Sequence, residues 1–132
     1  MPDGTIERNK TMQVTIKNLE SYLLKTYSGF AEEHGAHLTE NNLFMKLVEE
    51  IGEVAEVINM KTGRKANELA DIEVELGKEL ADVIHYAVAI AAVNGIDLNE
   101  VIINKDREAS VKYHHTINLE EFITESEKEN VQ

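Results

Sequence analysis

Two pairs of carboxylates are the part of the sequence best suited to chemistry. Glu50 and Glu53 form one pair, Glu79 and Asp82 form the other, and each pair has the i,i+3 spacing of neighbours on a helix. Side chains three residues apart on a helix lie roughly 5–6 Å from each other, close enough to hold one cation. Two such pairs facing each other across a bundle would form an oxygen-rich site for Mg²⁺, with Mn²⁺ as an alternative. The spacing therefore predicts a metal-dependent enzyme that acts on phosphates.

The composition favours an all-α, single-domain protein in which helices carry these pairs. The chain has 132 residues, one proline, no tryptophan and no cysteine. This length suffices for one hydrophobic core, and the abundance of Leu, Ala, Glu and Lys favours helices. We expect residues 1–11 to form a flexible leader and residues 12–132 to form one helical domain. Without cysteine, disulfides and thiolate metal sites are excluded.

The charge and the hydropathy restrict the classes of partner. A formal net charge of −12 argues against non-specific binding of DNA or RNA, because a nucleic acid polymer repels an acidic surface. It leaves nucleotides open, since bound divalent cations reverse the sign of a local acidic cluster. Residues 1–10 hold no apolar signal-peptide stretch, and the most apolar run, residues 83–93, is too short to span a bilayer. We expect a cytoplasmic protein that binds no membrane.

The first two helices are predicted from hydrophobic periodicity and capping signals. One helix is expected over about 12–33, and a second from an N-cap at Thr39 to about Lys61. Glu50 and Glu53 fall near the edge of the apolar stripe of this second helix, where a metal site would be shielded. That stripe consists of Leu43, Leu47, Ile51, Val54 and Ile58.

A third helix carries the second carboxylate pair and ends near Gly95, with a start as early as Glu68. Beyond Asp82 it is apolar nearly all the way round, which predicts burial on all sides. A small bundle rarely buries a helix completely, so we expect a homodimer or homotetramer. One face of this helix is expected to hold Leu76, Leu80, Val83, Ile84, Ala87 and Ala91, and an adjoining face Glu75, Glu79, Asp82 and Tyr86.

Two capping boxes predict the remaining helices of a four- to five-helix bundle. Asp97 with Glu100 begins a fourth helix that runs to about Tyr113, and residues 118–121 repeat the pattern ahead of a last helix over about 119–128. The tetrapeptide at 68–71 is identical to the one at 79–82. Only the second copy leads directly into the apolar helix, so we interpret the first as a chance repeat.

Histidine and nucleophile chemistry receive less support. A di-iron bundle needs two Glu-x-x-His motifs, and the nearest approach is the Asp82-x-x-His85 spacing, without a second copy. We therefore expect His85 to be buried or interfacial, and His114 and His115 to be solvated. No nucleophile elbow and no phosphate-binding glycine loop occur, so the nucleophile of a catalytic chain would be water.

Three segments resemble the MazG-like, all-α nucleoside triphosphate pyrophosphohydrolases. Residues 47–56 resemble the E-E-x-x-E signature of that family, and residues 79–86 resemble its E-x-x-D signature. Residues 95–98, followed by Lys105, Lys112 and Tyr113, are similar to its third element, so that the resemblance covers about residues 40–113. It implies a MazG-like helical domain that hydrolyses (deoxy)nucleoside triphosphates to the monophosphate and pyrophosphate.

The resemblance also implies roles for individual residues. Glu50, Glu53, Glu79 and Asp82 would coordinate Mg²⁺, and Glu49 would bind a further metal or help to deprotonate the attacking water. The acids of the first signature would thus be catalytic. Residues that would bind the substrate are Lys105 and Tyr113 at phosphate oxygens, Lys112 beside them, and Tyr86 in the wall of the nucleotide pocket.

The chain departs from the family pattern at two points. Ala109 stands where many relatives have an asparagine, so one polar contact to the nucleotide is either missing or supplied by another residue, which puts substrate choice in doubt. Relatives often stack the base on tryptophan, which is absent here. Four aromatic residues could substitute, although core packing explains the spacing of most of them equally well: Tyr22, Tyr27, Phe30 and Phe44.

Three functional hypotheses follow. The leading one is a Mg²⁺-dependent nucleoside triphosphate pyrophosphohydrolase that removes unwanted nucleotides from the cellular pool. The alternative is a non-catalytic, oligomeric helical interaction protein whose acids are solvated or interfacial. The third is a family member that has kept the metal site but lost broad activity.

Overall fold

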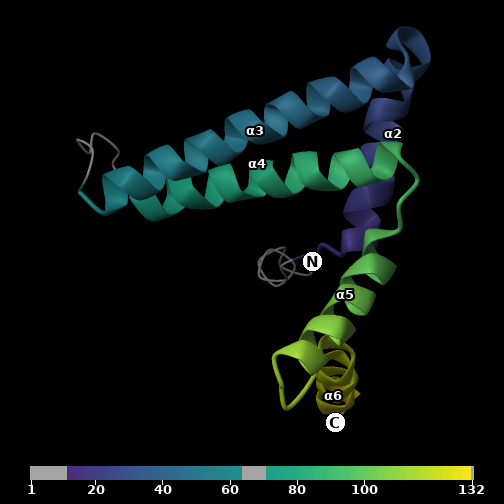
Figure 1. The fold of residues 1–132 in the computed structure, drawn as a ribbon, viewed down its shortest axis with the longest axis vertical. Helices are drawn as coiled ribbons and strands as arrows, with labels where there is room; N and C mark the ends of the chain where they lie inside the picture. Colours follow the sequence, from purple (N-terminus) through teal and green to yellow (C-terminus); the bar gives the residue numbers. More distant parts are fainter. Residues whose placement is uncertain (1–11, 64–70, 132) are drawn as a thin grey trace, which may run out of the picture.

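Helices form all of the regular structure in the part of the chain that the structure describes. The computed structural model describes residues 12–63 and 71–131 (Figure 1). The five helices in these ranges are α2 (Ile16–His34), α3 (Ala36–Lys61), α4 (Ile72–Val93), α5 (Leu98–Lys112) and α6 (Leu119–Val131). The predicted all-α class is therefore confirmed. The expected leader at residues 1–11 and the expected helix start at Glu68 lie outside the described residues.

The helices form one antiparallel hairpin, a helix that crosses it, and a second pair, α5 and α6, whose axes are steeply inclined to each other (Figure 1). α3 and α4 run side by side in opposite directions as the hairpin, and α2 crosses both where α3 begins and α4 ends (Figure 1). α5 leads away from that crossing and packs against α2 and α6 (Figure 1). The α3–α4 hairpin carries the four carboxylates of the sequence prediction, and α5 carries Lys105 and Lys112.

Short polar side chains begin four of the helices. Thr15 Oγ1 accepts a hydrogen bond from Asn18 N (3.0 Å), Asp71 Oδ1 from Val74 N (3.2 Å), and Asp97 Oδ1 from Glu100 N (3.3 Å). In the last cap, Asn118 Oδ1 accepts from Glu121 N (2.8 Å), while Asn118 N donates to Glu121 Oε1 (3.3 Å). The predicted N-caps Asp97 and Asn118 are therefore confirmed, and Asn118 with Glu121 forms a complete capping box. Asp71, the last residue of the repeated tetrapeptide, is the N-cap of α4, and the interpretation of that repeat as chance stays an interpretation.

The junction between α2 and α3 differs from the prediction. α3 begins at Ala36, directly after Gly35, whose φ of 93° is open to glycine and strained for other residues. Thr39, predicted as the N-cap, lies inside α3 with 1% of its surface exposed, and its Oγ1 donates to Gly35 O at 2.9 Å. The prediction was wrong because a single glycine breaks the helix without a polar linker. The outer ends also differ, with α2 starting at Ile16 and α6 reaching Val131.

The core lies where α2 crosses the α3–α4 hairpin. Alanines on α4 permit close approach of the helix axes, since the distance between packed helices depends on the side chains at the contact. Beyond the crossing, no other helix of residues 12–63 and 71–131 covers the hairpin (Figure 1). The buried cluster consists of Leu23, Leu43, Val88, Ala89 and Ala92.

Among the described residues, only one face of each long helix is covered by other parts of the chain. On α3, Val57 is buried (6% exposed), whereas Ile51 (52%) and Ile58 of the predicted stripe are exposed. On α4, Leu80 and Ile84 of the predicted inner face are exposed, as is Ala87. The complete burial of α4, which was expected only with self-association, is not reached within the described residues of one chain, because these helices are apolar on more than one face and each has too few neighbours to cover all of them.

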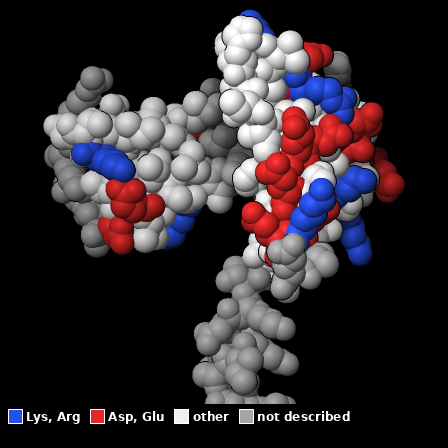
Figure 2. Space-filling view, turned by 90° about the horizontal axis from the view of Figure 1, so that it is seen from below, with Lys and Arg blue, Asp and Glu red and all other residues white. Residues whose placement is uncertain are grey.

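Polar contacts join α5 to its two neighbours, α2 and α6. Glu20 of α2 accepts a hydrogen bond from Leu98 N at the start of α5 (3.1 Å). Asp106 Oδ2 accepts one from Leu119 N at the start of α6 (2.6 Å). Arg107 and Glu120 form an exposed ion pair across the same two helices. Seen from the side of α5 and α6, charged side chains crowd this end, and the visible part of the α3–α4 arm is mostly uncharged (Figure 2).

No single helix in the described ranges combines the length and hydropathy needed to cross a membrane. α4 and α5 pass that test of length and composition only as a pair, and the two are bent by 108° relative to each other.

Candidate functional site

The antiparallel register of α3 and α4 brings acids from the two helices to the same level. Glu50 is eleven residues before the end of α3, and Asp82 is ten residues after the start of α4. Glu50 also lies seven positions from both Leu43 and Val57, which are buried, so all three share one side of α3. The structure therefore turns Glu50 toward α4, further inward than the edge position that the predicted stripe implied.

Three carboxylates converge between the two helices. Glu50, Glu79 and Asp82 each have an oxygen that lies within 4.8 Å of those of the other two. Glu50 and Glu79 are half-buried and Asp82 is exposed, so the cluster opens to solvent on one side. Like charges at this separation repel one another, and partial burial increases the cost. The arrangement lacks a positive charge among its three members.

The electrostatics of the cluster act most strongly on Glu79. Partial burial raises the pKa of Glu79, and the hydrogen bond that its protonated form donates to Glu50 raises it further. The negative charges of Glu50, Glu53 and Asp82 act in the same direction. A neighbouring cation would oppose this shift and favour the ionised form of Glu79.

The donor set fits a hard divalent cation. Carboxylate oxygens are the ligands that Mg²⁺ and Mn²⁺ prefer, and solvent access on one side leaves room for water and phosphate oxygens in the coordination shell. The cluster offers three oxygen donors from two rigid helices. Glu50, Glu79 and Asp82 could therefore hold a metal ion.

The other two acids of the first motif lie differently. Glu53 is exposed and is outside the three-carboxylate cluster, although its charge reaches Glu79. Glu49 points to Lys46, with Glu49 Oε2 at 3.1 Å from the ammonium nitrogen in an exposed ion pair. That pair raises the pKa of Lys46 through a hydrogen bond and charge. The roles predicted for Glu49 and Glu53 stay predictions.

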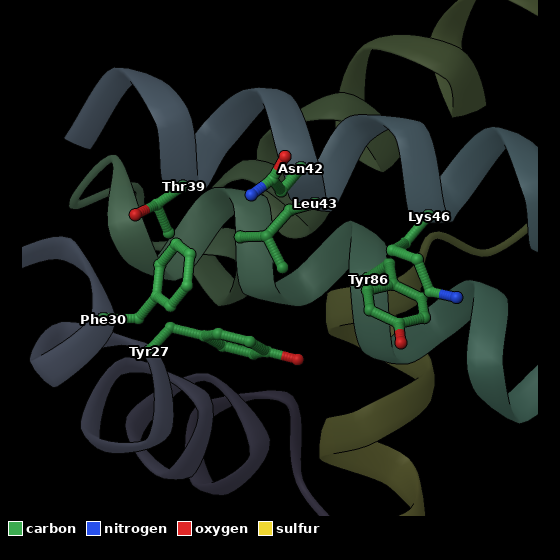
Figure 3. Close-up of a pocket in the computed structure, with 7 residues that line it drawn as sticks. All are labelled: Tyr27, Phe30, Thr39, Asn42, Leu43, Lys46 and Tyr86. Carbon is green, nitrogen blue, oxygen red and sulfur yellow. The ribbon is translucent and has the colours of Figure 1, made fainter. Parts of the chain in front are cut away.

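A pocket of about 220 Å³ lies one helical turn from the acids, between α2, α3 and α4 (Figure 3). Lys46 precedes Glu50 by four residues and Tyr86 follows Asp82 by four, so both helices lead from the cluster into the pocket walls. One turn of helix is about 5–6 Å. Three aromatic rings dominate the lining, which consists of Tyr27, Phe30, Thr39, Asn42, Leu43, Lys46 and Tyr86.

The aromatic residues of the sequence prediction divide into two groups. Tyr86, expected in the nucleotide pocket, lies in the pocket wall, and Tyr27 and Phe30 lie on the α2 side of the same pocket (Figure 3). Tyr22 and Phe44 are exposed and outside this lining. Tyr27 therefore packs beside the core and also lines the cavity, which combines the two roles considered from the sequence, whereas Phe30 lines the cavity and is partly exposed.

Sequence reasoning missed the polar residues of the pocket. Thr39, Asn42 and Lys46 precede the first acidic motif and share its helix. Thr39 Oγ1 and the Lys46 ammonium have partners within the chain, and the Asn42 amide points away from Leu43 near the pocket rim (Figure 3). The steps of four residues back from Glu50 to Lys46 and on to Asn42 are the signal that could have identified the last two.

The third predicted element is not joined to the acids within one chain. Lys105 and Lys112 lie on α5, and Tyr113 is its C-cap. α5 packs on α2 and α6 and runs away from the middle of the α3–α4 hairpin (Figure 1). The Lys112 ammonium lies 5.3 Å from the centre of the Tyr113 ring, a cation–π distance, and Tyr113 is exposed. Ala109, the departure in this element, is half-buried on α5.

The histidines match the interpretation made from the sequence. His85 is half-buried at the junction of α2 and α4, and its Nε2 lies 2.8 Å from Tyr27 Oη in a hydrogen bond. His114 and His115 are exposed in the connection between α5 and α6, where His114 has a φ of 56°. None of the three belongs to the carboxylate cluster.

An antiparallel helical hairpin with three clustered acids beside an aromatic pocket defines an all-α protein whose site could hold a metal ion. The sequence model of the MazG nucleotide pyrophosphohydrolase domain matches residues 38–113, more than half of the chain. The chain therefore belongs to the MazG nucleotide pyrophosphohydrolase family. A search of curated proteins found no match to it. The matched range contains the three clustered acids, most of the pocket lining and all of α5.

Proposed function

We propose that the protein hydrolyses (deoxy)nucleoside triphosphates to the nucleoside monophosphate and pyrophosphate in a Mg²⁺-dependent reaction. The observation that carries this proposal is the convergence of Glu50, Glu79 and Asp82 within 4.8 Å in a chain of the MazG family. Water attacks the α-phosphorus, the bond from that phosphorus to the oxygen bridging to the β-phosphorus breaks, and pyrophosphate leaves with that oxygen.

The chain's acids hold the metal and organise the water. The metal ligands would be Glu50, Glu79 and Asp82. Glu53, whose charge acts on Glu79, would be a further ligand. When bound, Mg²⁺ would neutralise triphosphate charge and stabilise the leaving group. Glu49, next to this group, would accept the proton of the attacking water once a substrate draws Lys46 toward phosphate oxygens.

The base and sugar would occupy the aromatic pocket. Its distance of about one helical turn from the acids suits a nucleotide whose phosphates lie at the cluster. Flat aromatic surfaces from Tyr27, Phe30 and Tyr86 can stack on a base or pack against a ribose. This assignment supplies the stacking surface that the chain needs in the absence of tryptophan.

We also propose that the working form is a homodimer or homotetramer. Exposed apolar side chains on the α3–α4 hairpin, including Val48, Ile51, Leu80 and Ile84, would be covered by a second copy. A second copy could also bring the α5 residues to the acids. A role in nucleotide-pool housekeeping and a cytoplasmic location remain predictions from the sequence.

The direct test measures pyrophosphate and monophosphate release from the common and modified nucleoside triphosphates, with Mg²⁺ and with a chelator. We expect Mg²⁺-dependent release that falls by about 100-fold or more in Glu50→Gln and Asp82→Asn, because lost metal ligation is worth several kcal/mol in the transition state. Glu33→Gln, an exposed acid on α2, is the matched control. Wild-type turnover in both site variants would remove the site assignment.

The rival hypothesis, a non-catalytic interaction protein, makes a different prediction for stability. Under the proposed function, Mg²⁺ with a nucleotide raises the melting temperature, because a ligand at about 100 times its dissociation constant adds about 2.7 kcal/mol to the free energy of unfolding. An interaction protein would show no such rise and no turnover.

A further inference from the structure

One side chain outside the acidic cluster contacts both aromatic walls of the pocket. His85 Nε2 is hydrogen-bonded to Tyr27 Oη at 2.8 Å, and the two rings meet edge to face at 5.9 Å between centroids. The His85 ring also meets Tyr86 edge to face at 4.8 Å. Tyr27 comes from α2 and Tyr86 from α4, and both line the pocket, whereas His85 itself does not. His85 therefore lies behind the two rings.

Its position separates His85 from the metal chemistry. The carboxylate cluster consists of Glu50, Glu79 and Asp82, and the Nε2 atom of His85 is engaged by Tyr27. Partial burial raises the pKa of Tyr27, so its phenol stays protonated and can donate to the imidazole. The hydrogen bond thus fixes the orientation of the Tyr27 ring by joining it to α4. Without it, the ring would be held by packing alone.

We propose that His85 is a positioning residue for nucleotide binding, which holds Tyr27 at the orientation and distance from Tyr86 that the base or ribose requires. This inference depends on the proposed function, because it assigns the aromatic pocket to the nucleotide. His85 touches neither the phosphates nor the reacting atoms. Its loss therefore weakens ground-state binding and leaves the chemical step nearly unchanged.

The test compares variants that keep or remove the hydrogen bond. His85→Leu and Tyr27→Phe should each raise KM about 3- to 10-fold, with kcat changed less than twofold, since a buried hydrogen bond contributes about 0.5–1.5 kcal/mol. The double variant should show no further increase, because both changes remove the same contact. His85→Gln, whose amide can reach Tyr27 Oη, should restore most of the affinity. His37→Leu, an exposed histidine on α3, is the matched control.

Several outcomes overturn the inference while leaving the proposed function intact. These are an unchanged KM in His85→Leu, additive effects in the double variant, or a lower melting temperature as the one change observed. If the wild-type protein hydrolyses no triphosphate, the proposed function fails, and binding of nucleoside monophosphates by calorimetry then decides the inference. Equal dissociation constants for wild type and His85→Leu, or no binding by either, would exclude the positioning role.

Discussion

Two charged clusters of the molecule, one where α5 meets α6 and one between α3 and α4, are arranged in opposite ways. Where α5 meets α6, Arg107 is paired with Glu120, and Asp106 accepts a hydrogen bond from the backbone at the start of α6. Between α3 and α4, three acids of like charge, Glu50, Glu79 and Asp82, converge. Charges that satisfy one another locally indicate structure, whereas like charges brought together on rigid helices indicate a binding site, because the fold bears a cost that only a ligand offsets.

The largest expected effect, on activity and not on stability, is that of Glu79→Gln in the cluster between α3 and α4. This variant keeps the size of the side chain but removes one of the converging charges. We expect pyrophosphate release to fall by about 100-fold or more, while the metal-free protein keeps or increases its free energy of unfolding at neutral pH. Steady-state kinetics and chemical denaturation with a chelator measure the two effects. A variant that loses stability as well as activity would contradict the assignment of this charge to function.

The opposite result, a loss of stability without a loss of activity, is expected for Asp106→Ala, where α5 meets α6. Its carboxylate accepts hydrogen bonds from Leu119 N at 2.6 Å and from Ser110 Oγ at 3.4 Å, so its removal leaves a helix start without a partner. We expect the free energy of unfolding to fall by about 1–3 kcal/mol. Turnover per folded molecule should stay the same when it is measured well below the melting temperature. Asp106→Asn, which keeps an acceptor oxygen, is the matched control.

The same contrast explains what could be predicted from the sequence. Local signals sufficed for the helical class, the N-caps Asp97 and Asn118, and the two acidic motifs, because each depends on residues a few positions apart. They failed at Thr39, because Gly35 allows α3 to restart immediately. They also failed at Ile51 and Val57, because the face that a helix buries is decided by its neighbours. The steps of four residues back from Glu50 could have placed Lys46 and Asn42 on the face of the acids. The pocket beside them depends on where α2 crosses, which no local pattern states.

An effect of intermediate size is expected for Lys105 of α5, which tests whether a second copy of the chain completes the site. Lys105 lies on a helix that packs against α2 and α6 in this chain, whereas the family resemblance implies contact with phosphate. If a second copy supplies this contact, Lys105→Ala should raise KM about tenfold through loss of one charge-assisted contact of about 1.4 kcal/mol. Mixing Lys105→Ala with Asp82→Asn should then restore part of the activity, because some sites would combine the intact halves of both chains.

The control for this mixing experiment is each variant with itself. Activity of the mixture that equals the mean of the two separate variants would show that each chain completes its own site. It would also remove the argument that α5 reaches the acids from a second copy. Lys128→Ala, an exposed lysine on α6, should leave KM unchanged.

The smallest expected effect is a pH dependence confined to the metal-free protein. The folded-state pKa of Glu79 is raised above its ordinary value, chiefly by partial burial and then by the neighbouring acids. Between the pKa of Glu79 in the unfolded state and its pKa in the folded state, the folded protein therefore binds more protons than the unfolded chain. This contribution to the free energy of unfolding is complete below the unfolded pKa and is lost as the pH rises through the folded pKa. Denaturation with a chelator, repeated across the acidic range, should show less of this decline in Glu79→Gln. Saturating Mg²⁺ should reverse the trend in the wild type, because a bound cation favours the ionised carboxylates. If neither Glu79→Gln nor saturating Mg²⁺ changes how stability depends on pH, the three acids interact too weakly to set their cluster apart from the charges between α5 and α6.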